Sequence, residues 1–155
     1  MNLHIAIRRV KENIMKGEKV LYSSKSDHWE TPQKLWEELD QEFHFDMDLA
    51  ASKTNSKCID REGEYENALE VNKFYNLMYW CNPPYSKCKE FVKLVYECKL
   101  RCVMLLPART CTRWFHKYIY NKPDVEIRFI KGRLKFSNSK NSAPFPSMIV
   151  IFRRW

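Results

Sequence analysis

Residues 77–88 read LMYWCNPPYSKC, an apolar run that ends in Asn82-Pro83-Pro84-Tyr85. The run Leu77-Met78-Tyr79-Trp80-Cys81 is continuously apolar, which is typical of a strand covered on both faces. From Ser86 onward the apolar residues recur at helical spacing. The stretch therefore predicts a strand, a rigid turn and a helix. The polar turn then lies at the carboxyl end of the strand, where open α/β sheets bind ligands.

The turn offers hydrogen-bond acceptors in a fixed arrangement. The side-chain oxygen of Asn82 and the carbonyl of Pro83 can accept protons from an exocyclic amino group such as that of adenine, and such preorganised dipoles stabilise charge that develops as the nitrogen reacts. Pro83 and Pro84 fix φ and remove competing N–H donors, while Tyr85 offers a flat face for a flipped-out base. Taken alone, the four residues are also compatible with a simple Pro-Pro turn and a packing tyrosine.

A second apolar run, Cys102-Val103-Met104-Leu105-Leu106, predicts a neighbouring parallel strand. With the intervening helix it forms a βαβ unit, so the residues that follow it, 107–112, face the same edge as Asn82. Thr112 is predicted to cap a short helix. Arg109 and Arg113 are candidate contacts to DNA phosphates, the alternative being solvated surface charges.

The last third of the chain predicts further strands. Ile127–Ile130 and Leu134–Phe136 are expected as two short strands that flank a basic tip, Lys131-Gly132-Arg133, suited to contact with a nucleic-acid backbone. A polar, proline-containing loop follows, and Met148–Phe152 is expected as the last buried strand.

The first third predicts a helix or arm and a linker over residues 1–26, followed by a single domain over 27–155. Thr31 is suited to the N-cap of a helix and Pro32 to its first position. The alternating segment 43–51 predicts a strand that ends in a tight turn, with Asp46 and Asp48 near its tip. A glycine-rich cofactor loop is absent, since the whole chain has three glycines.

The totals bound the function classes. A chain of 155 residues with a net charge of +8 and a pI near 9.2 favours an acidic partner, nucleic acid first and an anionic membrane second. No apolar run is long enough to span a bilayer, and no signal-peptide core is seen. The six cysteines form no Cys-x-x-Cys pair. We therefore expect reduced thiols, a cytoplasmic protein and no metal.

Seven motifs in order across residues 27–152 resemble the small phage-type DNA N6-adenine methyltransferases, a Dam-related family often carried by bacteriophages. The motifs are Trp29-Glu30-Thr31-Pro32, Phe45-Asp46-Met47-Asp48, Asn82-Pro83-Pro84-Tyr85, Leu106-Pro107-Ala108-Arg109-Thr110, Trp114-Phe115-His116, Gly132-Arg133-Leu134-Lys135-Phe136 and Ala143-Pro144-Phe145-Pro146-Ser147. Together they are far more specific than any one of them.

The resemblance implies an α/β fold, a minimal Rossmann-like methyltransferase with a mostly parallel central sheet flanked by helices and no separate target-recognition domain. It implies S-adenosylmethionine as the methyl donor, adenine N6 in double-stranded DNA as the acceptor and the bacterial host cytoplasm as the location of a phage-encoded enzyme. The catalytic corner would comprise Asn82, Pro83, Pro84 and Tyr85. Cofactor-binding residues would be Trp29, Thr31, Pro32, Asp46, Asp48, Ala50 and Asn67, and DNA-binding residues would be Arg109, Arg113, Lys131, Arg133 and Lys135.

Two positions depart from the family pattern. Asn67 stands where an aspartate is common, and Cys111 likewise replaces a residue that is often aspartate. Two other classes of function stay open. One is a methyltransferase acting on RNA or on a protein amide nitrogen, because the same corner serves those acceptors. The other is an inactive nucleic-acid-binding protein that kept the fold, which the poverty in glycine favours. The target DNA sequence and the oligomeric state cannot be read from the chain.

Overall fold

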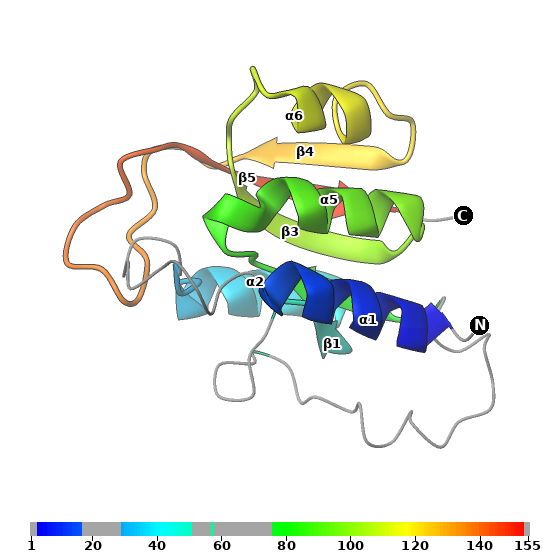
Figure 1. Cartoon of the computed structure of the whole chain (residues 1–155). Helices are drawn as coiled ribbons and strands as arrows, with labels where there is room; N and C mark the ends of the chain where they lie inside the picture. Colours follow the sequence, from blue (N-terminus) through cyan, green and yellow to red (C-terminus); the bar gives the residue numbers. More distant parts are fainter. Residues whose placement is uncertain (1–2, 17–28, 51–56, 58–75, 154–155) are drawn as a thin grey trace.

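The structure, a computed structural model, describes residues 3–16, 29–50, 57 and 76–153. Figure 1 shows one sheet with helices packed against it. In chain order the elements are α1 (Leu3–Lys16), α2 (Gln33–Phe43), β1 (Met47–Asp48), β2 (Met78–Cys81), the 3₁₀ helix η2 (Tyr85–Lys87), α5 (Cys88–Glu97), β3 (Arg101–Pro107), α6 (Arg113–Tyr118), β4 (Val125–Phe129) and β5 (Ser147–Phe152).

The strands form a single sheet in the order β1-β2-β3-β5-β4. The first three run parallel, as the sequence predicted for β2 and β3, whereas β5 is antiparallel to both β3 and β4. The sheet is thus parallel at one end and antiparallel at the other. The carboxyl ends of β1, β2, β3 and β4 therefore share one edge of the sheet.

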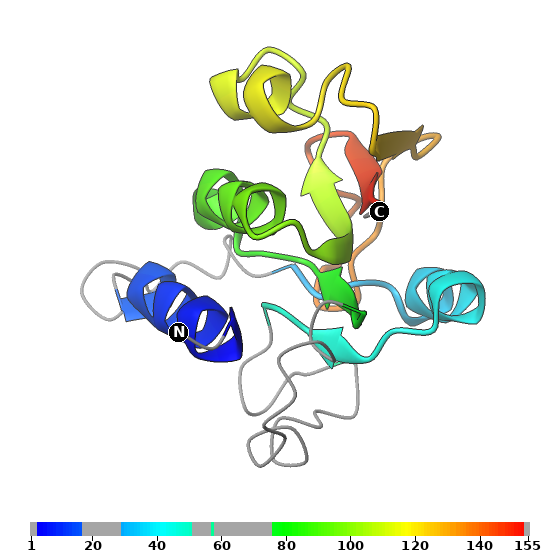
Figure 2. The same cartoon turned by 90° about the vertical axis from the view of Figure 1, so that its right-hand side faces the viewer.

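Helices cover both faces of this sheet. Seen along the sheet in Figure 2, α2 lies on one face, and α1 and α5 lie on the other. The predicted apolar stripe of α5 is buried, and this helix contacts both α1 and α6. Because both faces are covered, β2 and β5 are buried along their whole length. The continuous apolar runs follow from this double coverage.

The predicted helix starts are half right. Thr112 caps α6, its hydroxyl accepting a hydrogen bond from the amide of Phe115 at 3.4 Å. The prediction for Thr31 is wrong, because α2 starts at Gln33 with Pro32 in the N-cap position. The Thr31 hydroxyl accepts a hydrogen bond from the side chain of Asn82 at 3.0 Å, and no side chain caps α2.

The predicted strand at Leu134–Phe136 is also wrong. The strand expected at 127–130 is present as β4, but residues 130–146 connect β4 to β5 without a strand. The carbonyl of Leu134 accepts a hydrogen bond from the amide of Ala143 at 2.7 Å, within the connection itself. Gly132 turns the chain with a φ of 76°, which costs glycine little. Around Leu134–Phe136 the carbonyls of Leu134 and Phe136 thus accept hydrogen bonds from within the connection and not from a neighbouring strand.

The N-terminal helix expected within residues 1–26 is present as α1, and its Ile7 is buried. The linker and Asn67 lie outside the described residues, and the domain boundary stays a prediction. Within the described ranges no helix is long and apolar enough to cross a membrane. The same ranges hold no cluster of three or more metal-ligating side chains. Five cysteines in these ranges are free thiols.

An ionic network joins α2 to the antiparallel end of the sheet. The Arg128 guanidinium donates to both carboxylate oxygens of Glu42 at 2.7 Å, and Arg153 donates to Glu126 at 2.6 Å. The hydrogen bond from Arg128 lowers the pKa of Glu42. Hydrogen bonds from Arg153 and Arg128 lower the pKa of Glu126. Both carboxylates therefore hold fewer protons in the folded than in the unfolded chain.

We predict an acid-sensitive stability that depends on Arg128. Carboxylates with a lowered pKa contribute stability above their ordinary pKa of 4.5, and this contribution is lost as the pH falls through the folded value. The melting temperature should fall between about pH 5 and pH 3, and Arg128→Gln should flatten this dependence. Arg113→Gln, at an exposed position, is the control for loss of a positive charge. An unchanged slope in Arg128→Gln would contradict the assignment.

Candidate active site

The predicted Asn-Pro-Pro-Tyr turn lies at the carboxyl end of β2, as expected. Pro83 and Pro84 are buried, and Asn82 is partly buried. Tyr85 opens η2, which is closed by a hydrogen bond from the amide of Lys87 to the carbonyl of Pro84 at 2.8 Å. Buried residues on both sides of Asn82 fix the position of the backbone from which its side chain extends.

The amide of Asn82 has a defined orientation. Its Nδ2 donates to the carbonyl oxygen of Trp29 and to Oγ1 of Thr31, the latter at 3.0 Å. A carbonyl oxygen can only accept, so the amide nitrogen must face Trp29. The opposite atom, Oδ1, is buried and has no hydrogen-bond partner. A buried acceptor without a donor is costly, and at the edge of a sheet it marks a place for a ligand's donor.

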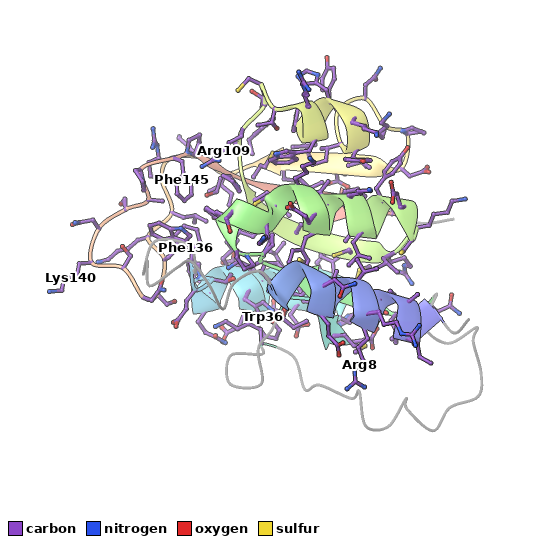
Figure 3. The ribbon with its side chains drawn as sticks, in the orientation of Figure 1. Arg8, Trp36, Arg109, Phe136, Lys140 and Phe145 are labelled. Carbon is purple, nitrogen blue, oxygen red and sulfur yellow. The ribbon has the colours of Figure 1, made fainter. Side chains whose placement is uncertain are left out.

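Four aromatic rings pack around this corner, and every pair among them is in contact. Centroid separations run from 4.9 Å for Tyr85 and Phe145 to 6.3 Å for Phe136 and Phe145. The fourth ring belongs to Trp29, 5.1 Å from Phe136 and 6.2 Å from Tyr85. Figure 3 shows Phe136 and Phe145 on the 130–146 connection at this end of the molecule. We call Trp29, Tyr85, Phe136 and Phe145 the aromatic cluster.

The aromatic cluster changes the prediction for Tyr85. Its side chain is 9% exposed, so the face expected to stack on a base is largely covered by its neighbours. Burial, with a smaller effect of Cys88, raises the pKa of Tyr85 despite opposing effects of Ser147 and Arg109. The phenol is therefore neutral across the physiological range.

The sequence did not single out Phe136 and Phe145 as site residues. For Phe145 the signal was a large apolar residue in a polar, proline-containing loop, whereas Phe136 was expected at the end of a strand.

The segment 29–31 is fastened on two sides. Asn82, at the end of β2, donates hydrogen bonds to it on one side. The 130–146 connection forms hydrogen bonds with it on the other. The amide of Glu30 donates to Oδ1 of Asn138 at 3.1 Å, and its carbonyl accepts from the amide of Ser137 at 3.0 Å. The Ser137 hydroxyl also donates to the carbonyl of Thr31 at 3.3 Å. Trp29 and Thr31, predicted near a cofactor, thus lie between the turn and the connection.

The other predicted cofactor residues sit around β1. The Asp48 carboxylate accepts hydrogen bonds from the amides of Ala50 at 3.1 Å and Lys57 at 3.2 Å, which shapes the turn after the strand. Asp48 pairs with Trp80 in the parallel register of β1 and β2. Ala50 and Asn82, each two residues further along, therefore follow the same end of the sheet. Asp46 comes directly before β1, and its carboxylate accepts a hydrogen bond from the amide of Met78 at 2.8 Å.

The predicted DNA-binding residues are all exposed at this edge of the sheet or beside it: Arg109, Arg113, Lys131, Arg133 and Lys135. The segment after β3 and the end of the 130–146 connection are joined by a hydrogen bond from the amide of Ala108 to the carbonyl of Pro146 at 2.9 Å. Figure 3 shows Arg109 and Lys140 at the same end of the molecule as Phe136. None of the five predicted residues forms an ion pair with another residue in the described ranges.

Fold and site together define an α/β protein with an oriented amide at the carboxyl edge of its sheet, where proteins of this class bind ligands. The family model described as DNA N-6-adenine-methyltransferase (Dam) matches residues 19–155. The chain therefore belongs to the Dam family of DNA N-6-adenine-methyltransferases, which confirms the resemblance seen in the sequence.

One relative supports the same family. The chain is 33% identical over 103 residues to the DNA N-6-adenine-methyltransferase of Escherichia phage T1. The alignment covers 64% of this chain and 43% of the phage protein, so the chain spans less than half the length of that relative. No solved structure gives a significant match.

We predict that Phe136 is a principal support of the site. It is 1% exposed, so Phe136→Ala should lower the free energy of unfolding by about 3–5 kcal/mol, and Phe136→Leu by much less. Urea denaturation measures both. Phe129→Ala, at a side chain that is 64% exposed, is the matched control and should change stability by about 0.5 kcal/mol or less. Equal effects of the two alanine variants would contradict the role of Phe136.

Proposed function

We propose that this protein transfers a methyl group from S-adenosylmethionine to the N6 amino group of adenine in DNA. The observation that carries the proposal is the buried, unpartnered Oδ1 of Asn82, oriented away from Trp29 and Thr31 by the bonds that Nδ2 donates to them. Membership of the Dam family supports the same reaction.

The nitrogen of an exocyclic amine is a weak nucleophile, because its lone pair is delocalised into the ring. Oδ1 of Asn82 can accept one of its protons, and the carbonyl of Pro83 can accept the other. Two acceptors on one amino group favour tetrahedral geometry, in which the lone pair is localised, and they stabilise the positive charge that develops on nitrogen. Since the amide is already oriented, little reorganisation is needed when the base arrives.

The sheet supports a minimal Rossmann-like methyltransferase fold. Three parallel strands bring the ends of β1, β2 and β3 to one edge, and β5 enters antiparallel between β3 and β4. Open α/β sheets bind ligands beyond the carboxyl ends of their strands. Asn82 and the turn after β1 lie at that edge.

The residues at the end of β1 fit the cofactor. S-adenosylmethionine supplies an electrophilic methyl group when it is bound. Asp48 provides a carboxylate that can accept from ribose hydroxyls, and Ala50 beside it leaves room that a larger side chain would fill. We propose Trp29, Thr31 and Pro32 as the neighbouring wall and Asn67 as a further contact. Asp46 is the least favoured member, because it lies before β1 and so further from the carboxyl edge of the sheet than Asp48.

The distribution of charge supports DNA as the substrate. From Cys98 to the C-terminus the sequence has thirteen lysines and arginines and only two acidic residues, Asp124 and Glu126. Arg128 and Arg153 are neutralised in the ionic network, whereas Arg109, Arg113, Lys131, Arg133 and Lys135 are exposed. Uncompensated cations near a candidate active site are suited to phosphate contacts.

The decisive test is methyl transfer by the wild-type protein and by Asn82→Ala. Wild type should bind S-adenosylmethionine in a calorimetric titration and transfer labelled methyl to adenine in unmethylated DNA. Asn82→Ala should retain DNA binding, yet transfer methyl about 10²–10³-fold more slowly, as is typical for loss of one preorganised group. Label in RNA or protein alone would move the assignment to those acceptors. A folded protein that binds no cofactor would refute the proposal.

We further predict that Thr31 positions Asn82 and does so through its hydroxyl. Thr31→Val removes the acceptor for Nδ2 while keeping the shape, so kcat should fall by about tenfold or more, the cost of one misplaced hydrogen bond. Thr31→Ser should retain most activity. Steady-state kinetics separate this role from cofactor binding. A rise in the KM for S-adenosylmethionine with unchanged kcat would assign Thr31 to the cofactor instead.

A further inference from the structure

Phe129 is the most exposed large hydrophobic side chain in the described part of the chain, at 64%. It is the last residue of β4, the edge strand, where it pairs with Met148 of β5. An exposed phenylalanine at a strand end gains nothing from the core of its own domain. Its position relative to the candidate active site is therefore of interest.

The direction of the Phe129 side chain follows from strand alternation. Arg128 reaches Glu42 of α2, so it points to the face of the sheet that α2 covers. Successive residues of a strand point to opposite faces. Phe129 therefore points to the other face, which α5 covers. The Asn-Pro-Pro-Tyr turn leads into α5 and so to the same face of the sheet.

Phe129 also lies at the same edge of the sheet as the turn. The amide of Ile130 donates to the carbonyl of Ser147 at 3.1 Å, and Ser147 pairs with Pro107 at the end of β3. Figure 1 shows the end of β4 beside the start of the 130–146 connection. Three strand spacings separate β4 from β2, which amounts to about 14 Å.

The surroundings of Phe129 match nucleic acid. Lys131 and Arg133 follow it, both exposed, with Gly132 turning the chain between them. No acidic residue occurs after Glu126 in the whole sequence. An apolar ring flanked by cations complements a base stack flanked by phosphates. Binding to the surface of another protein would not by itself account for this excess of positive charge.

We propose that Phe129 inserts into the DNA duplex at the target site and occupies the stack that the extruded adenine leaves. Apolar side chains that enter a base step compensate part of the cost of unstacking, and aromatic rings suit this because every base presents a flat face. Lys131 and Arg133 hold the adjoining phosphates. Phe129 is thus a positioning residue for the transfer, and this role rests on the proposed function.

The test compares two duplexes that carry the methylated sequence mapped on genomic DNA. In one the target adenine pairs with thymine, and in the other an abasic site faces it, so that extrusion is cheap. Phe129→Ala should lower the rate on the paired duplex by about tenfold or more and the rate on the abasic duplex little. With 2-aminopurine at the target position, wild type should raise the fluorescence of the paired duplex, and Phe129→Ala should not.

Matched variants distinguish the outcomes. Phe129→Leu keeps a large apolar side chain and should restore most activity, while Tyr120→Ala removes another exposed aromatic ring, 56% exposed, and should have no effect. Normal transfer and fluorescence in Phe129→Ala would overturn the inference. So would an equal loss on both duplexes, or a change in oligomeric state by light scattering, which would assign Phe129 to self-association. If wild type methylates no DNA, the proposed function itself fails, and Phe129 loses this role with it.

Discussion

The hydrogen bonds from the Asn82 amide to the Trp29 carbonyl and the Thr31 hydroxyl are the interaction on which the rest of the site depends. They join the carboxyl end of β2 to the segment that enters α2, which covers the opposite face of the sheet from α5. They also consume the donor capacity of the amide, so that only its oxygen is left to meet a ligand. One pair of bonds thus sets both the packing and the chemistry of the corner.

The same segment organises the aromatic cluster. Trp29 supplies a carbonyl to Asn82 and a ring to Phe136 and Phe145, while the backbone of Glu30 pairs with the 130–146 connection. Trp29 and Phe145 are only partly buried, whereas Tyr85 and Phe136 are buried, so the first two can move at a lower cost in buried area. In the proposed function, a base that stacks on Tyr85 would have to displace some of this packing, so the connection and the proposed substrate would compete for one surface.

The sequence predicted what depends on local patterns and missed what depends on tertiary contacts. Continuous apolar runs predicted β2, β3 and β5 because double coverage leaves no polar face. The N-cap at Thr31 failed because α2 begins one residue later than expected, with Pro32 as the N-cap, while the Thr31 hydroxyl faces Asn82 from 51 residues away. The strand at Leu134–Phe136 failed because alternation cannot show that Phe136 packs on Trp29. The amide of Asn82 was found, but its orientation needed partners distant in the chain.

The basic residues divide into two sets with different physical roles. Arg128 and Arg153 lie at the antiparallel end of the sheet, where Glu42 and Glu126 neutralise them, so their positive charge serves the fold. The exposed cations after β3 and β4 have no such partners in the described ranges. Leaving like charges close together costs free energy in the absence of a polyanion. The proposed binding of DNA beside the oriented amide would recover that cost, which the paired arginines at the antiparallel end do not incur.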